Sequence, residues 1–308
     1  MRKAVRKINN VPCAETAGLE RLLKSKFGIS PENLLFANSI KELIYLVPAV
    51  LKPARVLIAG PAPDLYEDAA RSAGAEVSYI SAMGEDGFAF DLSRIKENAD
   101  NIDLVFFPNP NRVTGRLTSR ELILELLTLK PCEHTHFVID EALIDFAVPG
   151  DFRHDIIHAN LTILRTTANY YGLPGLELAY AVSTPGIIRS YGEKRYWEIN
   201  LLSIEAARTA FKDRAYRKAI EQYMSVEKAM VFRGLHKIDW LKVYETDTNI
   251  FLVKIHKDAE EAALKLRRAG LDIRDCSDIK GLDRSFFRIS VMKHENNLKL
   301  ISVLNSLG

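Results

Sequence analysis

Little in the 308-residue sequence points outside a reducing, aqueous compartment. The three cysteines, Cys13, Cys132 and Cys276, are far apart and form no Cys-x-x-Cys pair, which predicts free thiols rather than disulfides. No apolar run reaches the ~18 residues of a membrane helix, and the basic N-terminus lacks the apolar core of a secretion signal. These absences predict a cytoplasmic protein without a membrane partner.

The sequence also lacks an excess of charge of either sign. Its 42 lysine and arginine residues and 40 aspartate and glutamate residues leave a formal net charge of +2, too even for a nucleic-acid partner. The seven histidines show no metal-ligand spacing. His134 and His136 would share one face of a strand, but a metal site there lacks a third ligand. We therefore expect neither nucleic acid nor a metal.

Short apolar runs alternate with amphipathic helical segments over the first two thirds of the chain. Strands are expected at 55–60, 76–80, 103–107, 136–140 and 161–165. Helices are expected at 66–73 and from an N-cap at Thr118 through Leu127. This alternation predicts an α/β fold with a mostly parallel sheet covered by helices on both faces. Ligands of such sheets bind at the carboxyl ends of the strands, where Asp140 falls.

The pattern changes after about residue 185. One long helix is expected from about 204 to 235. Short strands at 241–244, 249–254, 271–273 and 286–291 then alternate with helices at 259–269 and 295–307. Mixed short elements of this kind predict a smaller α+β domain in the last third of the chain.

The stretch from Leu164 to Tyr180, LRTTANYYGLPGLELAY, is the most informative in the sequence. It resembles the segment around the Schiff-base lysine of pyridoxal-phosphate (PLP) enzymes of the class I/II aminotransferase family. There the pattern reads roughly Ser-x-x-Lys-x-(Phe/Tyr)-Gly-(Ile/Leu)-x-Gly-(Ile/Leu)-Arg-(Leu/Ile)-Gly-Tyr. Further motifs agree in order and spacing, at 28–38, 42–44, 109–115, 138–142 and 274–289. Within the family the chain looks closest to threonine-phosphate decarboxylase of cobalamin synthesis, then to histidinol-phosphate aminotransferase.

The resemblance spans about residues 19–308 and implies the PLP-transferase fold type I. It divides the chain into a shortened N-terminal arm at 1–29, a large domain at 30–205 and a small C-terminal domain at 206–308. It also implies PLP as the cofactor, a homodimer with the active sites at its interface, and a small amino-acid or phosphorylated ligand.

Three residues match functional positions of the family. Asp140 matches the carboxylate that pairs with the ring nitrogen of the cofactor, and Thr166 matches a hydroxyl that binds the cofactor phosphate. Arg288 matches the arginine that forks onto the substrate carboxylate. Without the resemblance, Asp140 is equally well a strand-end residue that caps the next segment, and Arg288 a strand-end arginine in a surface ion pair.

Other positions depart from the family pattern. Asn169 stands at the lysine, and an amide cannot form the internal aldimine. Glu177 stands at the phosphate-binding arginine and would set a carboxylate beside the phosphate. Arg112 replaces the asparagine that bonds the phenolic oxygen. The phosphate-loop positions hold Ser39, Ile40 and Lys41, and further departures fall at Pro63, Val113, Leu143 and Met292.

Three functions are compatible with this pattern. The first is a degenerate homologue, or pseudoenzyme, that has lost conventional PLP activity and acts as a binding or partner protein. The second is an aminotransferase or a threonine-phosphate-like decarboxylase that binds its cofactor without a covalent link. The third is an ordinary PLP decarboxylase or aminotransferase. We expect no other lysine to substitute at position 169, because Lys194 lies on a polar helical stretch and Lys254 and Lys280 lie in the small domain.

Overall fold

The computed structural model describes residues 16–91, 93–98, 101–128, 134–148, 159–195, 198–256, 259–271 and 273–307, together with Val5. Cys13, Cys132 and residues 1–4 and 6–15 of the predicted N-terminal arm lie outside the described residues. Cys276 is a buried free thiol. None of the described helices combines the length and apolar character that crossing a membrane requires.

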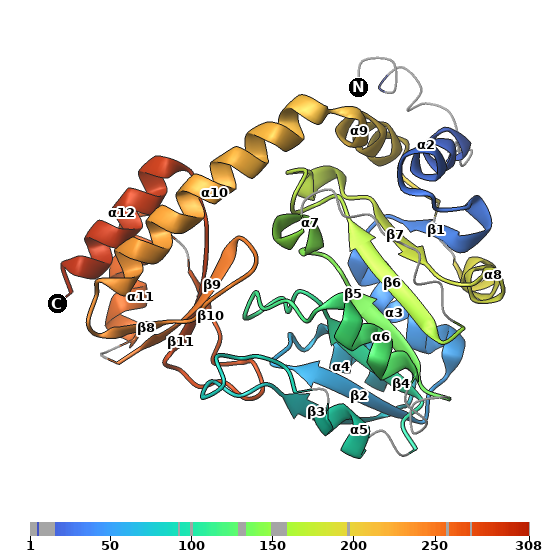
Figure 1. Ribbon diagram of the computed structural model, residues 1–308, viewed down its shortest axis with the longest axis horizontal. Helices are drawn as coiled ribbons and strands as arrows, with labels where there is room; N and C mark the ends of the chain where they lie inside the picture. Colours follow the sequence, from blue (N-terminus) through green and yellow to red (C-terminus); the bar gives the residue numbers. More distant parts are fainter. Residues whose placement is uncertain are drawn as a thin grey trace.

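A seven-stranded sheet forms the larger part of the molecule, in the order β1-β7-β6-β5-β4-β2-β3 (Figure 1). β2, β3, β4, β5 and β6 pair in parallel, whereas β7 is antiparallel to both of its neighbours, β6 and β1. The prediction of a mostly parallel sheet is therefore confirmed. The strands are β1 (Leu34–Ala37), β2 (Arg55–Gly60), β3 (Glu76–Ser81), β4 (Leu104–Pro108), β5 (His136–Asp140), β6 (Leu161–Thr166) and β7 (Ala179–Val182).

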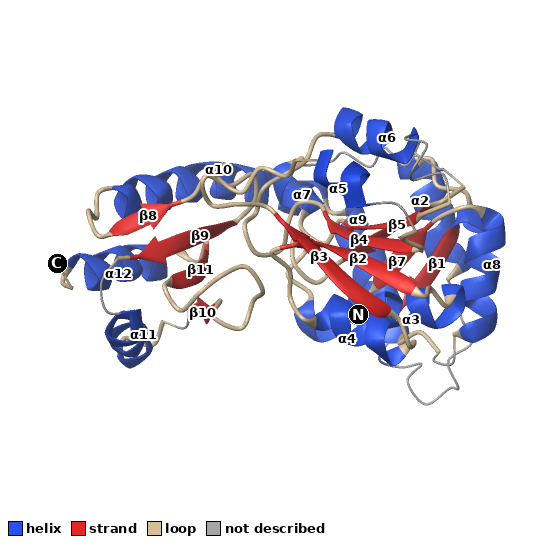
Figure 2. Cartoon of the chain, turned by 90° about the horizontal axis from the view of Figure 1, so that it is seen from below, coloured by secondary structure: helices blue, strands red, loops and turns tan. Residues whose placement is uncertain are grey.

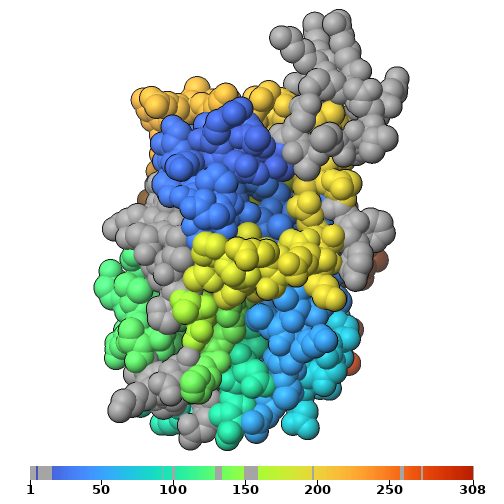
Figure 3. Space-filling model, turned by 90° about the vertical axis from the view of Figure 1, so that its right-hand side faces the viewer, coloured from blue at the N-terminus to red at the C-terminus, as the bar shows by residue number. Residues whose placement is uncertain are grey.

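Helices cover both faces of this sheet because successive strand residues point to opposite sides. Ile58, Phe106 and Val138 pack on one side with α3 (Ile40–Leu51), α4 (Leu65–Ser72) and α8 (Pro185–Lys194). The neighbouring strand residues pack on the other side with four helices (Figure 2). These are α2 (Ala17–Phe27), α5 (Ser93–Asn98), α6 (Arg120–Thr128) and α9 (Leu201–Lys212). α8 packs beside β1 and crosses the outer face below α2 (Figure 3).

A second, four-stranded antiparallel sheet follows in the order β10-β11-β9-β8. Its strands are β8 (Leu241–Val243), β9 (Ile250–Ile255), β10 (Arg274–Asp275) and β11 (Phe286–Ser290). α10 (Arg214–His236), α11 (Ala259–Arg268) and α12 (His294–Asn305) cover it. α10 runs from the large sheet to the small one (Figure 1). Its length lets one helix contribute to both parts of the molecule.

Three expected element boundaries were wrong. The single helix at 204–235 is two helices, because Asp213 ends α9 and its side chain accepts a hydrogen bond from Tyr216 N at 2.8 Å to cap α10. Ser119 rather than Thr118 starts α6, since its carbonyl accepts the first helical bond from Ile123 N at 3.1 Å.

The strand expected at 271–273 is displaced toward the C-terminus. Leu271 N is used to close α11, because it donates to the Leu266 carbonyl at 2.9 Å. The β10 ladder therefore begins at Arg274, opposite Arg288 of β11.

Candidate functional site

The predicted site residues gather where β5 and β6 end, and we call this region the strand-end site. It comprises Arg112, Asp140, Asn169, Thr166, Glu177 and the first turn of α3, with Tyr66 from α4. Parallel strands end at the same edge of a sheet, so residues from distant parts of the chain meet there. The region contains one cluster around Asp140, a second cluster around Glu177, and the side-chain amide of Asn169.

Asp140 is the centre of the first cluster, and its side chain is fully buried. Tyr66 donates its hydroxyl to Asp140 Oδ2 at 2.7 Å, and Arg112 Nη1 lies 3.2 Å from the same oxygen. The other carboxylate oxygen accepts from Ala142 N at 2.9 Å. Asp140 therefore has a protein partner on each oxygen and a guanidinium beside it.

The charges of this cluster raise the pKa values of Arg112 and Tyr66. Burial lowers the pKa of Arg112, but Asp140 and Tyr66 outweigh that effect and raise it overall. Burial and the Asp140 charge raise the pKa of Tyr66 well above its ordinary value. Tyr66 thus stays a hydrogen-bond donor, and Arg112 stays a cation beside the Asp140 carboxyl group.

Arg112 belongs to the loop after β4, which is held against the end of β5. Asn109 N donates to the Asp140 carbonyl at 2.9 Å, and the Asn109 side chain bonds the backbone of Thr118 in both directions. From the small sheet, Arg288 Nη1 donates to the Arg112 carbonyl at 3.0 Å. Arg288 therefore reaches the site, although its bond is to backbone. Burial lowers its pKa.

Glu177 is the centre of the second cluster. Its Oε1 accepts from Ile40 N at 3.0 Å and from Thr166 Oγ1 at 2.6 Å. Ser39 caps α3, because its hydroxyl accepts from Glu42 N at 3.2 Å. The carboxylate thus lies at the positive end of α3, where unsatisfied N–H groups and the helix dipole favour an anion. Lys41 instead faces the Tyr45 ring, 5.9 Å from its centroid.

Asn169 lies in the turn that follows β6. Its Nδ2 donates to the Ala142 carbonyl at 3.0 Å, two residues beyond Asp140, and its own carbonyl accepts from Gly172 N at 3.2 Å. The side chain is therefore anchored to the loop after β5 as a neutral amide. It supplies no nucleophilic amine.

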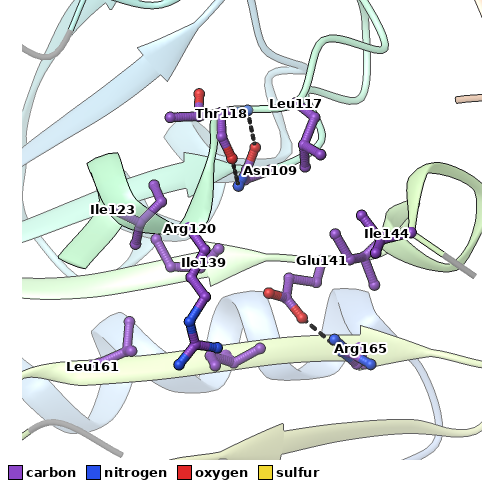
Figure 4. Close-up of a pocket in the computed structure, with 12 residues that line it drawn as sticks. Asn109, Leu117, Thr118, Arg120, Ile123, Ile139, Glu141, Ile144, Leu161 and Arg165 are labelled. Atoms are coloured by element: carbon purple, nitrogen blue, oxygen red, sulfur yellow. Dashed lines mark hydrogen bonds and ion pairs between the residues drawn. The ribbon is translucent and has the colours of Figure 1, made fainter. Parts of the chain in front are cut away.

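Sequence reasoning missed Tyr66 in the strand-end site and an ion pair on the other face of the sheet. Tyr66, three residues after Pro63, reaches Asp140 from the first turn of α4, and only its place at the start of the helix was a signal. Arg165 Nε also bonds Glu141 Oε2 at 2.6 Å on the opposite face of the sheet. Figure 4 shows this pair beside the Asn109–Thr118 bonds, in a small cavity of about 90 Å³. Opposite charges at the ends of adjacent strands were the available signal.

The family described as aminotransferase class I and II matches residues 3–304. The chain belongs to this family. Histidinol-phosphate aminotransferase 2 of Archaeoglobus fulgidus is 31% identical over 99% of this chain and 86% of that protein. The bifunctional adenosylcobalamin biosynthesis protein CobDQ of Leptospira interrogans is 26% identical over 96% of this chain, which covers 35% of that protein.

A solved structure extends the comparison to the fold. The L-threonine-O-3-phosphate decarboxylase of Porphyromonas gingivalis superposes with a TM-score of 0.86 and 26% identity, over 99% of this chain and 93% of the other. The fold is therefore the PLP-transferase fold type I, and PLP is the cofactor of the family.

Proposed function

We propose that this protein is a degenerate homologue of the class I/II aminotransferases in which its own side chains take the two charged ends of the cofactor position. Glu177 carries the proposal: its carboxylate accepts from Ile40 N and Thr166 Oγ1, the groups that the resemblance assigns to the cofactor phosphate. Arg112 pairs with Asp140, which the resemblance assigns to the protonated ring nitrogen. An internal anion and an internal cation thus replace the phosphate and the ring.

The residues present do not fit PLP. A phosphate at α3 would compete with Glu177 for both donors, and two unit charges of the same sign about 4 Å apart repel by about 4 kcal/mol under protein-surface screening. The ring would have to displace the Arg112 guanidinium from a fully buried carboxylate. Asn169 has no amine that could bind PLP covalently and so offset these two costs. We therefore assign the scaffold a binding or partner role rather than PLP-dependent chemistry.

The candidate substitute lysines support this proposal. Lys280 bonds Glu67 and lies 4.4 Å from the Tyr79 ring centroid, and Lys254 lies over the Phe286 ring at 5.2 Å. Lys194 is exposed at the end of α8. None of these three amines lies in the turn that carries Asn169, and Lys194 instead borders a cavity with Ser39 and Lys41 at the start of α3.

The experiment is to incubate the purified protein with PLP, reduce with borohydride and measure the intact mass. We expect a colourless protein and no stoichiometric adduct. A stoichiometric adduct on one defined lysine would restore the ordinary-enzyme hypothesis. A catalytically active relative treated in parallel shows that the trapping conditions work.

A second candidate is an aminotransferase or threonine-phosphate-like decarboxylase that holds PLP or pyridoxamine phosphate without a covalent link. The retained Asp140 and Thr166 favour it, as do the names of the relatives, including the cobalamin-synthesis protein. It requires Arg112 and Glu177 to move aside. Saturable binding of pyridoxamine phosphate, followed by its own fluorescence and weakened in Asp140→Asn, would favour this candidate over the first.

We also propose that the protein is a cytoplasmic homodimer, as the resemblance implies. Light scattering at micromolar concentration is expected to give twice the 34.7 kDa chain mass. A monomeric mass would count against the dimer without affecting the proposal for the strand-end site.

A further inference from the structure

A second site lies between α10 and the large sheet, in a cavity of about 280 Å³ that we call the α10 cavity. Asp145 of α7 (Ile144–Ala147), Tyr170, and Glu221 and Lys228 of α10 line it, together with Asn249 at the start of β9. Of the described residues around this cavity, none belongs to the strand-end site. Its size suits a small metabolite rather than a drug-sized ligand.

Two acceptor atoms at this cavity are buried without a partner. Asp145 is only 8% exposed, and its Oδ1 has no hydrogen-bond partner among the described residues. The same holds for the side-chain oxygen Oδ1 of Asn249. A buried carboxylate oxygen without a donor costs about 1–3 kcal/mol, so native structures usually supply one. Both atoms are covered by neighbouring side chains, so a ligand that carries N–H donors would satisfy them by displacing that cover.

The surroundings of Asp145 disfavour its ionised form. Burial raises the pKa of Asp145 to about 6, with Glu141 adding to the effect and Arg165 and Arg217 opposing it. At neutral pH the group is therefore mostly ionised, although its environment disfavours the charge. A bound cation would relieve that cost.

Lys228 of α10 contributes a cation to the cavity lining, and Met224, Phe146 and Tyr170 contribute an apolar surface. Burial lowers the pKa of Lys228, while the Asp247 charge opposes that effect. Glu221, Met224 and Lys228 are three and four residues apart along α10 and so share one helix face. Phe146 and Tyr170 pack edge to face with ring centroids 5.2 Å apart. The cavity therefore combines an acceptor end, a cation and an apolar wall, and the carboxylates of Glu221 and Asp247 also line it.

We propose that the α10 cavity binds a small zwitterion with a primary ammonium group and a carboxylate. Asp145 and Asn249 accept hydrogen bonds from the ammonium, Lys228 binds the carboxylate, and Met224 with the Phe146–Tyr170 pair contacts the carbon chain. This site goes beyond the proposed function and shares no residue with the strand-end site. A failure here would leave the PLP-trapping result untouched, so the two proposals fail separately.

The test measures binding of β-alanine, γ-aminobutyrate and δ-aminovalerate to the full chain by calorimetry, with butylamine and butyrate as single-charge probes. We expect at least one zwitterion to bind, butylamine to bind more weakly, and butyrate to bind weakest. Wild-type protein that binds none of the zwitterions would overturn the proposal.

Variants assign the two ends of the ligand. Asp145→Asn should weaken zwitterion and butylamine binding by about tenfold or more, the loss of a charge-assisted hydrogen bond. Asn249→Ala gives a second test of the same end, with thermal unfolding as the check on folding. Lys228→Gln should weaken the zwitterion but leave butylamine unchanged.

Lys218→Gln, an exposed position on the same helix, is the matched control and should bind all probes as the wild type does. Unchanged zwitterion affinity in both Asp145→Asn and Lys228→Gln would show that any binding occurs elsewhere, and the assignment would be wrong.

Discussion

The strand-end site and the α10 cavity treat buried charge in opposite ways. In the strand-end site, Asp140 and Glu177 each have donors from the protein, and Arg112 supplies the countercharge to Asp140. In the α10 cavity, Asp145 Oδ1 and Asn249 Oδ1 have none among the described residues. Since burial of an unpaired polar group is costly, the first arrangement closes a site and the second leaves one open to a ligand. The familiar binding position of this fold is thus the one whose charged groups already have protein partners.

The largest expected effect is in the strand-end site. Asp140→Asn removes the countercharge of Arg112 and should lower the free energy of unfolding by about 3–5 kcal/mol, because it leaves a guanidinium without its ion pair. Urea denaturation measures the change, and Asp86→Asn at an exposed position is the control. A loss below about 1 kcal/mol would mean that Arg112 is already solvated, and the closed description of the site would be wrong.

The opposite sign is expected in the α10 cavity. The folded pKa of Asp145 is about 6, against an ordinary value of 3.8, so its ionisation opposes folding above pH 6. Asp145→Asn should raise the free energy of unfolding by up to about 3 kcal/mol at pH 8. The gain should shrink between pH 6 and pH 4, because the wild-type carboxyl becomes protonated in both states.

Urea denaturation at pH 8 and at pH 4, without added ligand, measures this difference. A gain that does not depend on pH would show that the substitution acts through packing, not through the charge.

How far the sequence predicts the molecule depends on whether the determinants are local. The five parallel strands were predictable because each is a short, largely apolar run bounded by polar segments. The pairing of β1 with β7 was not, since the paired residues Leu34 and Val182 are 148 positions apart in the sequence. The end of α9 depends on one capping side chain, Asp213, inside a continuous helical pattern.

The same distinction holds for the strand-end site. Asp140 was predictable as a polar residue that ends a buried strand. The Glu177–Ile40 bond joins residues 137 positions apart, and the Arg112–Asp140 pair depends on the conformation of a loop. The resemblance located Glu177 near the phosphate position, but only the structure shows that its carboxylate takes the donors.

The smallest expected effect separates charge from hydrogen bonding at α3. Glu177→Gln keeps an acceptor for Ile40 N and Thr166 Oγ1 but removes the charge from the helix N-terminus, so it should lower the free energy of unfolding by about 0.5–1 kcal/mol. The loss should diminish in high salt. Thr166→Val, which removes one donor and leaves the charge, provides the comparison. Equal stability of Glu177→Gln and the wild type in low salt would contradict a role for the charge.

Competition between Glu177 and the cofactor phosphate can be followed by the visible absorbance of PLP added to Asn169→Lys and to Asn169→Lys with Glu177→Arg. We predict weak aldimine absorbance in the single variant, because Glu177 still occupies the phosphate donors. The double variant should gain clearly more, and adding Arg112→Asn should raise it further. Equal cofactor binding by the single and double variants would contradict the account, because Glu177 would then not compete with the phosphate.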